Sequence, residues 1–378
     1  MSPLRLVVVT VSAVLCAGSN TPPPFSWDTV GGMVFIQVGN PQGTVEKPFD
    51  DATTKILAKY PWVCFEKFQG THTPGYYEDK TAAACKAIKM INPKLSCFMY
   101  LNTELAFTGY RVVDEGLSKM PQFWLKKSDG QPARNHGPQA GCRNGKCPPG
   151  GMLVPDYSVP EAATFWFSVI SNLTRDSQVD GCNMDRSNDL EGDTCWVCKG
   201  TGGVPSNGGW HGYMAGKLAG LKAITPKAHL VINNIGTSNI VTGAWGNCIE
   251  GFGPQEKNIL TLQALAKEGL GAKAHCCRDG RFNGCSWENV QDGLAAFLIG
   301  AGENAFFACG EGFEMGSWIK WFPQYDNPLG RPLGDGVKGK DGVWTRSFVS
   351  GTTVRFTPEG DKKGGIGEIT WGKTPPKT

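Results

Sequence analysis

Acidic side chains end several short apolar segments of this sequence. In the stretch DGCNMDRSND, residues 180–189, the run CNMD ends at Asp185, and Arg186 and Asn188 follow at once. WVCFE ends at Glu66 and NCIE ends at Glu250 in the same way. Two carboxyl groups can together hydrolyse a glycosidic bond, one as a protonated acid and the other as an ionised nucleophile or base. The residue types therefore indicate glycoside hydrolysis as the candidate chemistry.

Other reaction classes lack their signatures in the sequence. There is no Gly-x-Ser-x-Gly or Ser-His-Asp arrangement, no phosphate-binding glycine loop and no His-rich metal set. The net charge of +3 with 19% charged residues excludes a nucleic-acid-binding composition. Carboxylates, amides and aromatic rings remain, and these suit sugar binding. We predict a carbohydrate substrate and no cofactor.

Short β-rich segments alternate with segments whose apolar residues recur at helical spacing. Six segments have the helical pattern: 50–60, 78–91, 159–173, 211–224, 256–270 and 287–302. Strands that alternate with helices pair in parallel through right-handed crossovers. Eight such units predict an α/β fold, a (β/α)8 TIM barrel with a small C-terminal β appendage. The eight expected strands are Met33–Val38, Trp62–Lys67, Cys97–Asn102, Cys182–Asp185, His229–Asn234, Asn247–Phe252, Ala272–Cys277 and Asn304–Cys309.

Two gaps depart from a regular barrel, so an open doubly wound sheet stays as the alternative fold. Residues 102–182 exceed one crossover helix and are expected to hold a Cys/Gly/Pro-rich insertion around 126–155. Residues 234–247 are too few for a full crossover helix. We place the barrel domain at 20–309. The alternating strands after it predict a final helix and the β appendage at 310–378.

In a barrel, the ends of all strands converge on one mouth, where barrel enzymes have their active sites. Asp185 ends the fourth expected strand and Glu250 the sixth, so the two can face each other across a sugar. We predict Asp185 as nucleophile or base and Glu250 as acid/base. Glu66 is a third candidate, which could share the charge load or bind substrate. Further substrate-binding candidates near the strand ends are Tyr100, Asn102, Arg186, Asn188, Trp210, Asn233 and His275.

Each candidate also has a purely structural interpretation. An acid at a loop start often caps a helix or pairs with arginine, and the aromatic residues can belong to the core. For Asp189, Glu191 and Asp193, a solvated loop is favoured over a calcium site, because their spacing matches no known ligand loop. Cys195 and Cys198 could bind zinc with His275, Cys276 and Cys277, but no second regular Cys-x-x-Cys supports it. We predict no metal.

The first residues are typical of an export signal. Arg5, the apolar run 6–15 and the small residues 17–19 match a cleaved signal peptide at 1–19, and the run is shorter than the roughly 20 apolar residues of a membrane span. Of 14 cysteines, Cys16 lies there, and the other 13 predict several disulfides in an oxidising compartment. The sequon Asn172-Leu173-Thr174 can carry a glycan. The protein is therefore expected to be secreted.

The order of several motifs resembles a group of TIM-barrel proteins described as hypothetical glycosyl hydrolases and, more remotely, endo-α-1,4-polygalactosaminidase and α-galactosidase-type barrels. The motifs are YPWVCFEKFQG, NPKLSCFMYLNTELAF, DGCNMDRSN, EGFGPQ, AAFLIGAG and YDNPLGRPLGDG, followed by WTRSFVSGTTV. The resemblance spans about 32–353 and implies a catalytic Asp185 and Glu250. α-Galactosidase-type barrels retain configuration, which implies that Asp185 is the nucleophile. The cysteine-rich insertion and the loop GDTCWVCKG depart from this pattern and can reshape the cleft.

The sequence thus favours a secreted glycoside hydrolase acting on a poly- or oligosaccharide. Two alternatives remain: a carbohydrate-binding protein that has lost catalysis on the same barrel, and a metal-dependent hydrolase that uses the Cys/His/Asp residues.

Overall fold

The computed structural model describes residues 22–116, 119–135, 149–187, 201–224, 229–233, 244–276, 285–310, 316, 319–359 and 364–373. The expected export signal, 1–19, lies outside these ranges. So do residues 136–148 of the expected insertion and the cluster at 189–193.

Eight parallel strands form the centre of the protein in the order β1-β2-β3-β7-β9-β10-β11-β12. The first and last strands meet through contacts between β1 and β12 and a parallel bridge from Val34 to Phe307. This confirms the predicted barrel, because an open sheet would leave two separate edges. The strands are β1 (Phe35–Val38), β2 (Trp62–Phe65), β3 (Ser96–Asn102), β7 (Gly181–Asp185), β9 (His229–Asn233), β10 (Gly246–Phe252), β11 (Gly271–Cys276) and β12 (Ala305–Cys309).

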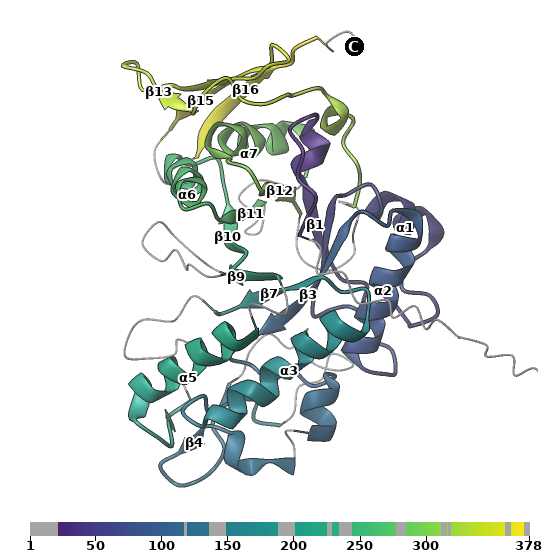
Figure 1. Ribbon diagram of the computed structural model, residues 1–378, viewed down its shortest axis with the longest axis vertical. Helices are drawn as coiled ribbons and strands as arrows, with labels where there is room; N and C mark the ends of the chain where they lie inside the picture. The colour runs from purple at the N-terminus through teal and green to yellow at the C-terminus, as the bar shows by residue number, and fades with distance from the viewer. Residues whose placement is uncertain are drawn as a thin grey trace, which may run out of the picture.

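Helices surround the strands (Figure 1). Local signals set their starts: the Asp50 carboxylate accepts a hydrogen bond from the Thr53 amide at 2.7 Å, and Pro160 stands at the first turn of α3. Between β9 and β10, the described residues contain no helix, and 234–243 lie outside them. The α-helices are α1 (Asp51–Leu57), α2 (Tyr77–Ile91), α3 (Pro160–Asp176), α5 (Gly209–Ile224), α6 (Glu256–Lys267) and α7 (Trp287–Gly300).

The long connection from β3 to β7 holds short irregular elements before α3. It contains the π-helical turn η2 (Val112–Gly116) and the 3-10 turn η4 (Pro121–Phe123). The pair β4 (Lys126–Lys127) with β8 (Gly203–Val204) and the pair β5 (Arg134–Asn135) with β6 (Met152–Leu153) are antiparallel. These short elements stand where the sequence predicted an insertion around 126–155, of which 136–148 lie outside the described residues.

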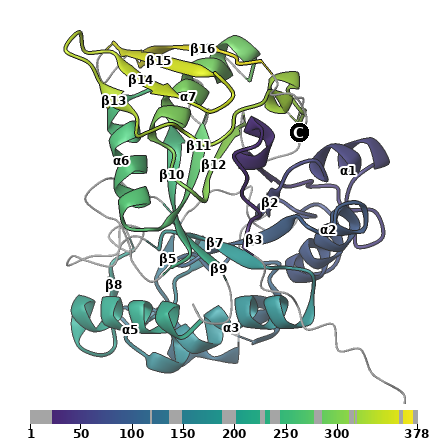
Figure 2. The same ribbon diagram turned by 45° about the horizontal axis from the view of Figure 1, so that its top comes forward.

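A small antiparallel sheet follows the barrel and lies against α7 (Figure 2). Its strands are β13 (Val337–Lys338), β14 (Trp344–Ser347), β15 (Thr353–Pro358) and β16 (Gly365–Thr370). A Cβ atom at Gly367 would come within 2.4 Å of the Ala295 side chain, so glycine allows β16 to pack closely on α7. Before this sheet, where we expected a final helix, the described residues contain the 3-10 turn η8 (Pro323–Asp326).

Arg346 of β14 joins this sheet to the end of α7. Its Nη1 donates to the carbonyls of Leu298 at 2.9 Å and Ala301 at 2.6 Å, and its Nε donates to the Gly334 carbonyl at 3.0 Å. The last carbonyls of a helix lack partners within the helix, and a cation there also complements the helix dipole. The appendage therefore caps the last helix of the barrel.

We expect Arg346→Met to lower the free energy of unfolding by about 3 kcal/mol, because it leaves buried carbonyls without donors. Urea denaturation measures the change. Arg355→Met on the exposed side of β15 is the matched control, and it should cost less than about 1 kcal/mol. Equal losses in the two variants would show that Arg346 does not act as a cap.

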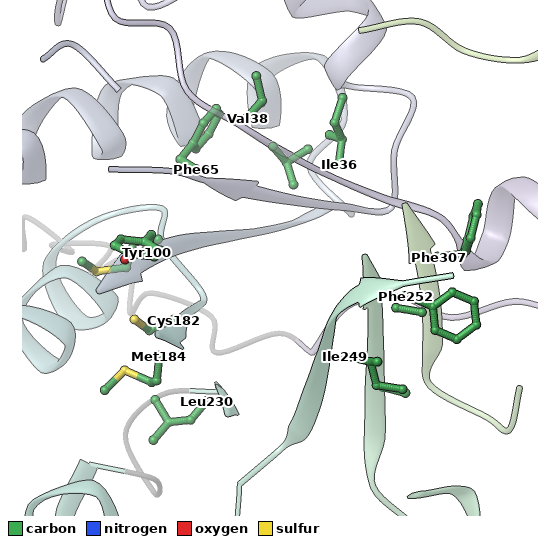
Figure 3. Packing of buried hydrophobic residues seen from close by; sticks show 14 of the residues in the cluster. Ile36, Val38, Phe65, Tyr100, Cys182, Met184, Leu230, Ile249, Phe252 and Phe307 are labelled. Atoms are coloured by element: carbon green, nitrogen blue, oxygen red, sulfur yellow. The ribbon is translucent and has the colours of Figure 1, made fainter. Parts of the chain in front are cut away.

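The two faces of the barrel strands carry different cores. Ile36, Val38, Met184 and Ile249 are in the cluster that packs between the strands and the helices (Figure 3). Inside the barrel, an aromatic cluster fills the end where the strands begin. The Trp62 ring there lies 4.9 Å from Phe35, 5.1 Å from Phe98, 5.4 Å from Phe306 and 5.5 Å from Trp245. The N-terminal end is thus plugged, and polar inward residues occur towards the other end.

Cysteines are partly bonded and partly buried as thiols. Cys85 of α2 and Cys97 of β3 form a disulfide, which agrees with the expectation of an oxidised protein. Cys64, Cys182 and Cys248 are buried thiols. Burial raises the pKa of the Cys64 thiol to about 12, so it stays protonated and unreactive. The expected local staples at Cys142 with Cys147 and Cys195 with Cys198 lie outside the described residues.

Candidate active site

Inward-facing residues at the C-terminal ends of the strands are polar or acidic. Side chains alternate between the two faces of a strand, so Asn183 and Asp185 of β7 share a face, as do Cys248 and Glu250 of β10. Cys248 belongs to the cluster inside the barrel, which places Glu250 on the inward face as well. Nine such residues gather at this end: Gln37, Glu66, Tyr100, Asn102, Asn183, Asp185, Glu250, Lys273 and His275.

The Asp185 carboxylate is held by three hydrogen-bond donors. Oδ2 accepts from the Tyr100 hydroxyl at 2.5 Å and from Asn102 Nδ2 at 3.0 Å, and Oδ1 accepts from the Arg186 amide at 3.0 Å. The side chain remains partly exposed. As an acceptor in all three contacts, the carboxylate has the form that a nucleophile or base requires.

Tyr100 and Asn102 orient Asp185. The Tyr100 ring is buried, and burial together with the Asp185 charge raises the pKa of its hydroxyl well above the usual value, so the hydroxyl stays a donor. Asn102 Oδ1 accepts from the amides of Glu104 at 2.9 Å and Leu105 at 2.8 Å, which fixes the amide that donates to Asp185. Direct contact of these two residues with a sugar stays a prediction.

Glu250 enters the same interior from β10, with β9 between it and β7. It is partly exposed and pairs in register with His275 of β11, which is buried. A bulge between Glu250 and Phe252, with Gly251 at a φ of 75°, redirects the strand at the barrel rim.

The charges of the three candidate acids affect the pKa of the Cys248 thiol in the barrel interior. Burial raises the pKa of this thiol to about 12, and Lys273 opposes the increase. The charges of Glu250, Asp185 and Glu66 raise the pKa further. These directions agree with the strand geometry, which turns Cys248 and Glu250 of β10 into the same interior as Asp185 of β7.

Glu66 follows β2, and both of its carboxylate oxygens are engaged. Oε1 accepts from Gln37 Nε2, while Oε2 accepts from Lys67 Nζ at 3.1 Å and from the Lys67 amide at 3.2 Å. The residue is only 1% exposed. Glu66 is thus placed to balance charge, and the more accessible acids are Asp185 and Glu250.

Lys273 brings a buried cation into the barrel. Its Nζ donates to Gln37 Oε1 and, at 3.0 Å, to Asn183 Oδ1. Burial by itself lowers the pKa of Lys273, but the nearby carboxylates of Glu66 and Glu250 oppose this, and the pKa lies above its usual value. Lys273 therefore stays charged and compensates the acids that surround it.

The remaining predicted residues differ in their placement. Trp210 stands in the first turn of α5, where its ring packs edge-on against Tyr213 at 5.3 Å, so it belongs to the helical layer and not to a strand end. Asn233 ends β9, and its backbone lies beside Cys248. Asn188 lies outside the described residues.

Lys217 and Lys273 were not among the predicted site residues, although their positions in the sequence pattern could have identified them. Tyr213, Lys217 and Leu221 recur at a spacing of four on the buried face of α5. A lysine in such an apolar stripe needs a buried partner. Lys273 lies two residues before His275 on the same strand face. Among the residues that the structure describes, no group of three His, Cys, Asp or Glu could hold a metal ion, and 188–200 and 277–284 lie outside them.

Two solved structures show what this barrel is similar to. It is similar to the GH36 α-galactosidase AgaA from Geobacillus stearothermophilus in complex with stachyose, with a TM-score of 0.47, 11% identity, and coverage of 87% of this chain and 48% of that one. It is also similar to a mutant of Kfla1895 in complex with isomaltose, with a TM-score of 0.46, 12% identity, and coverage of 76% and 43%. The chain thus spans less than half of each structure.

The family comparison is more specific. The model described as hypothetical glycosyl hydrolase family 15 matches residues 89–352, which is more than half of the chain and includes β3, β7 and β10. No curated protein matches the sequence. The chain belongs to hypothetical glycosyl hydrolase family 15.

Proposed function

We propose that this protein is a glycoside hydrolase that cleaves a poly- or oligosaccharide with Asp185 as nucleophile or base and Glu250 as acid/base. One observation carries the proposal: three donors hold the partly exposed Asp185 carboxylate at the barrel mouth, while Glu250 faces the same interior. Family membership supports the same reaction class.

The division of roles follows from the contacts. Asp185 is fixed by rigid donors, as suits a group that must meet the anomeric carbon or position a water. Glu250 lies directly before the bulge and is partly exposed, so it can reach the leaving oxygen and exchange its proton. Neighbouring strands lie about 4.8 Å apart. β7 and β10 are two such steps apart, which leaves room for a sugar between the carboxyl groups.

We further propose that the protein is exported and glycosylated. The basic and apolar start of the sequence supports a signal peptide, and the Cys85–Cys97 disulfide supports an oxidising compartment. Asn172 of the sequon is exposed on α3. Over the described residues, every helix is too short or too polar to cross a bilayer.

Activity against a panel of polysaccharides and aryl glycosides tests the proposal, with released reducing ends as the readout. We expect Glu250→Gln to lower kcat roughly 10²- to 10⁴-fold on natural sugars. The loss should be much smaller on aryl glycosides, because a good leaving group needs no proton. NMR of the first-formed anomer assigns retention or inversion.

Glu268→Gln, an exposed acid just after α6, is the matched control and should keep full activity. Equal losses of Glu250→Gln on both substrate types would assign Glu250 a role other than acid. Tight sugar binding without any turnover by the wild type would instead favour the carbohydrate-binding alternative.

A further inference from the structure

A buried ion pair lies directly behind the turn that follows Asp185. Lys217 Nζ of α5 is 3.0 Å from Glu104 Oε1, and both side chains have an exposure of 0%. The same Nζ donates to the backbone carbonyl of Arg186 at 2.6 Å. Three segments that are distant in sequence therefore meet at one ammonium group: the loop after β3, the turn after β7 and the middle of α5.

Close helix packing brings Lys217 to this position. A Cβ at Gly216 would lie 1.8 Å from the Tyr157 carbonyl, and one at Gly220 would lie 2.7 Å from the Ala163 side chain. α5 can thus approach the Tyr157–Ala163 region only because these positions are glycine. A buried ion pair is a weak source of stability, since desolvation of both charges offsets their attraction. Its presence on an apolar helix face therefore favours a role in fixing one conformation.

The ion pair holds the backbone conformation of Arg186. Its φ of 60° lies in the left-handed region, which is costly for a residue other than glycine and persists only where its surroundings enforce it. Two donors hold its carbonyl: Lys217 Nζ at 2.6 Å and Thr103 Oγ1 at 2.8 Å. At the other side of the same residue, the Arg186 amide donates to Asp185 Oδ1.

Glu104 links the Lys217–Glu104 pair to Asn102, which also donates a hydrogen bond to Asp185. The Glu104 amide donates to Asn102 Oδ1 at 2.9 Å, and Asn102 Nδ2 donates to Asp185 Oδ2. The Lys217–Glu104 pair is therefore connected to both oxygens of the carboxylate, one through Arg186 and the other through Asn102.

We propose that Lys217 is a positioning residue for the reaction: it holds Arg186 in the left-handed conformation, and thereby aims the Asp185 carboxylate, while Glu104 fixes Lys217. This inference rests on the proposed function of Asp185. The side chains of Lys217 and Glu104 are both fully buried, so a substrate cannot reach them, and their loss should affect kcat and spare substrate binding.

The test compares Lys217→Met with the double variant Lys217→Met/Glu104→Gln, which leaves no unpaired charge behind. We expect kcat to fall roughly 30- to 100-fold in both, because small displacements of a catalytic group have effects of this size. KM should stay within about threefold, and the double variant should melt near the wild-type temperature. In crystals of both variants, Arg186 should leave the left-handed region and its hydrogen bond to Asp185 should be lost.

The pair Lys89–Asp180, at the opposite end of β7, provides the matched control. Lys89→Met/Asp180→Asn removes a largely buried lysine–carboxylate pair at the barrel's closed end and should leave kcat unchanged. Recovery of kcat in the double variant, together with its stability, would show that Lys217 is merely structural and overturn the proposal. A rise in KM alone, or an unchanged Arg186 in both variants, would overturn it too.

Failure of the proposed function gives a different result. In that case, wild type shows no turnover on any substrate, or Asp185→Asn is as active as wild type. The crystallographic comparison of Arg186 then decides the positioning role by itself, because it needs no activity.

Discussion

Asp185→Asn is expected to abolish turnover while the fold is retained. Asn has nearly the same shape and can keep one acceptor oxygen, but it provides no anionic oxygen to attack an anomeric carbon or to accept a proton. The Tyr100 and Asn102 donors would face a neutral group instead of a carboxylate. We expect kcat to fall by roughly 10³-fold or more. Initial rates and thermal melting of the purified variant measure the effect.

Two further variants, Asp129→Asn and Asp185→Ala, test this prediction more specifically. Asp129→Asn, in an exposed turn shortly after β4, should retain full activity. Asp185→Ala opens space for azide, which should restore turnover and yield a glycosyl azide if Asp185 is the nucleophile. Rescue without such an adduct would favour the role of base. Unchanged activity of Asp185→Asn would move the chemistry elsewhere, with Glu66 as the next acid to test.

Asp180→Ala is expected to cause a large loss of stability. Asp180 is 1% exposed, and its Oδ2 accepts from Lys89 Nζ at 2.6 Å and from the Cys97 amide at 2.8 Å. Burial raises the pKa of this carboxyl, and the hydrogen bond from Lys89 opposes that increase. Removal of the acid leaves a largely buried ammonium and a buried amide without their acceptor, which should cost about 3 kcal/mol. Urea denaturation followed by tryptophan fluorescence measures it.

The double variant Asp180→Leu/Lys89→Met is the informative control. It removes both charges and replaces them with apolar side chains, so it should recover most of the lost stability. Both variants should keep wild-type kcat per folded molecule, because the N-terminal end of a barrel serves stability and the C-terminal end serves catalysis. If the double variant were as unstable as Asp180→Ala, the hydrogen bond from the Cys97 amide to Asp180, and not the ion pair with Lys89, would account for most of the lost stability.

The sequence by itself determined the layout of the barrel. All eight barrel strands and six helices lie within a few residues of the predicted segments. The short apolar runs reflect strands that are buried on both faces, and the helical spacing reflects one buried face of each helix. Both patterns are local, so they are readable without a structure. The same reasoning placed Asp185 and Glu250 at strand ends, and parallel strands bring such ends to one mouth.

Only the tertiary structure decided what each side chain does there. Glu66 directly follows β2, much as Asp185 ends β7, yet Gln37 and Lys67 engage both of its oxygens, whereas Asp185 stays partly exposed. Glu104 and Lys217 are 113 residues apart, and no local pattern links them. Exposure, partner choice and the left-handed turn at Arg186 arise from packing between distant segments. They are absent from any single window of sequence because their energies come from neighbours that the folded barrel alone brings together.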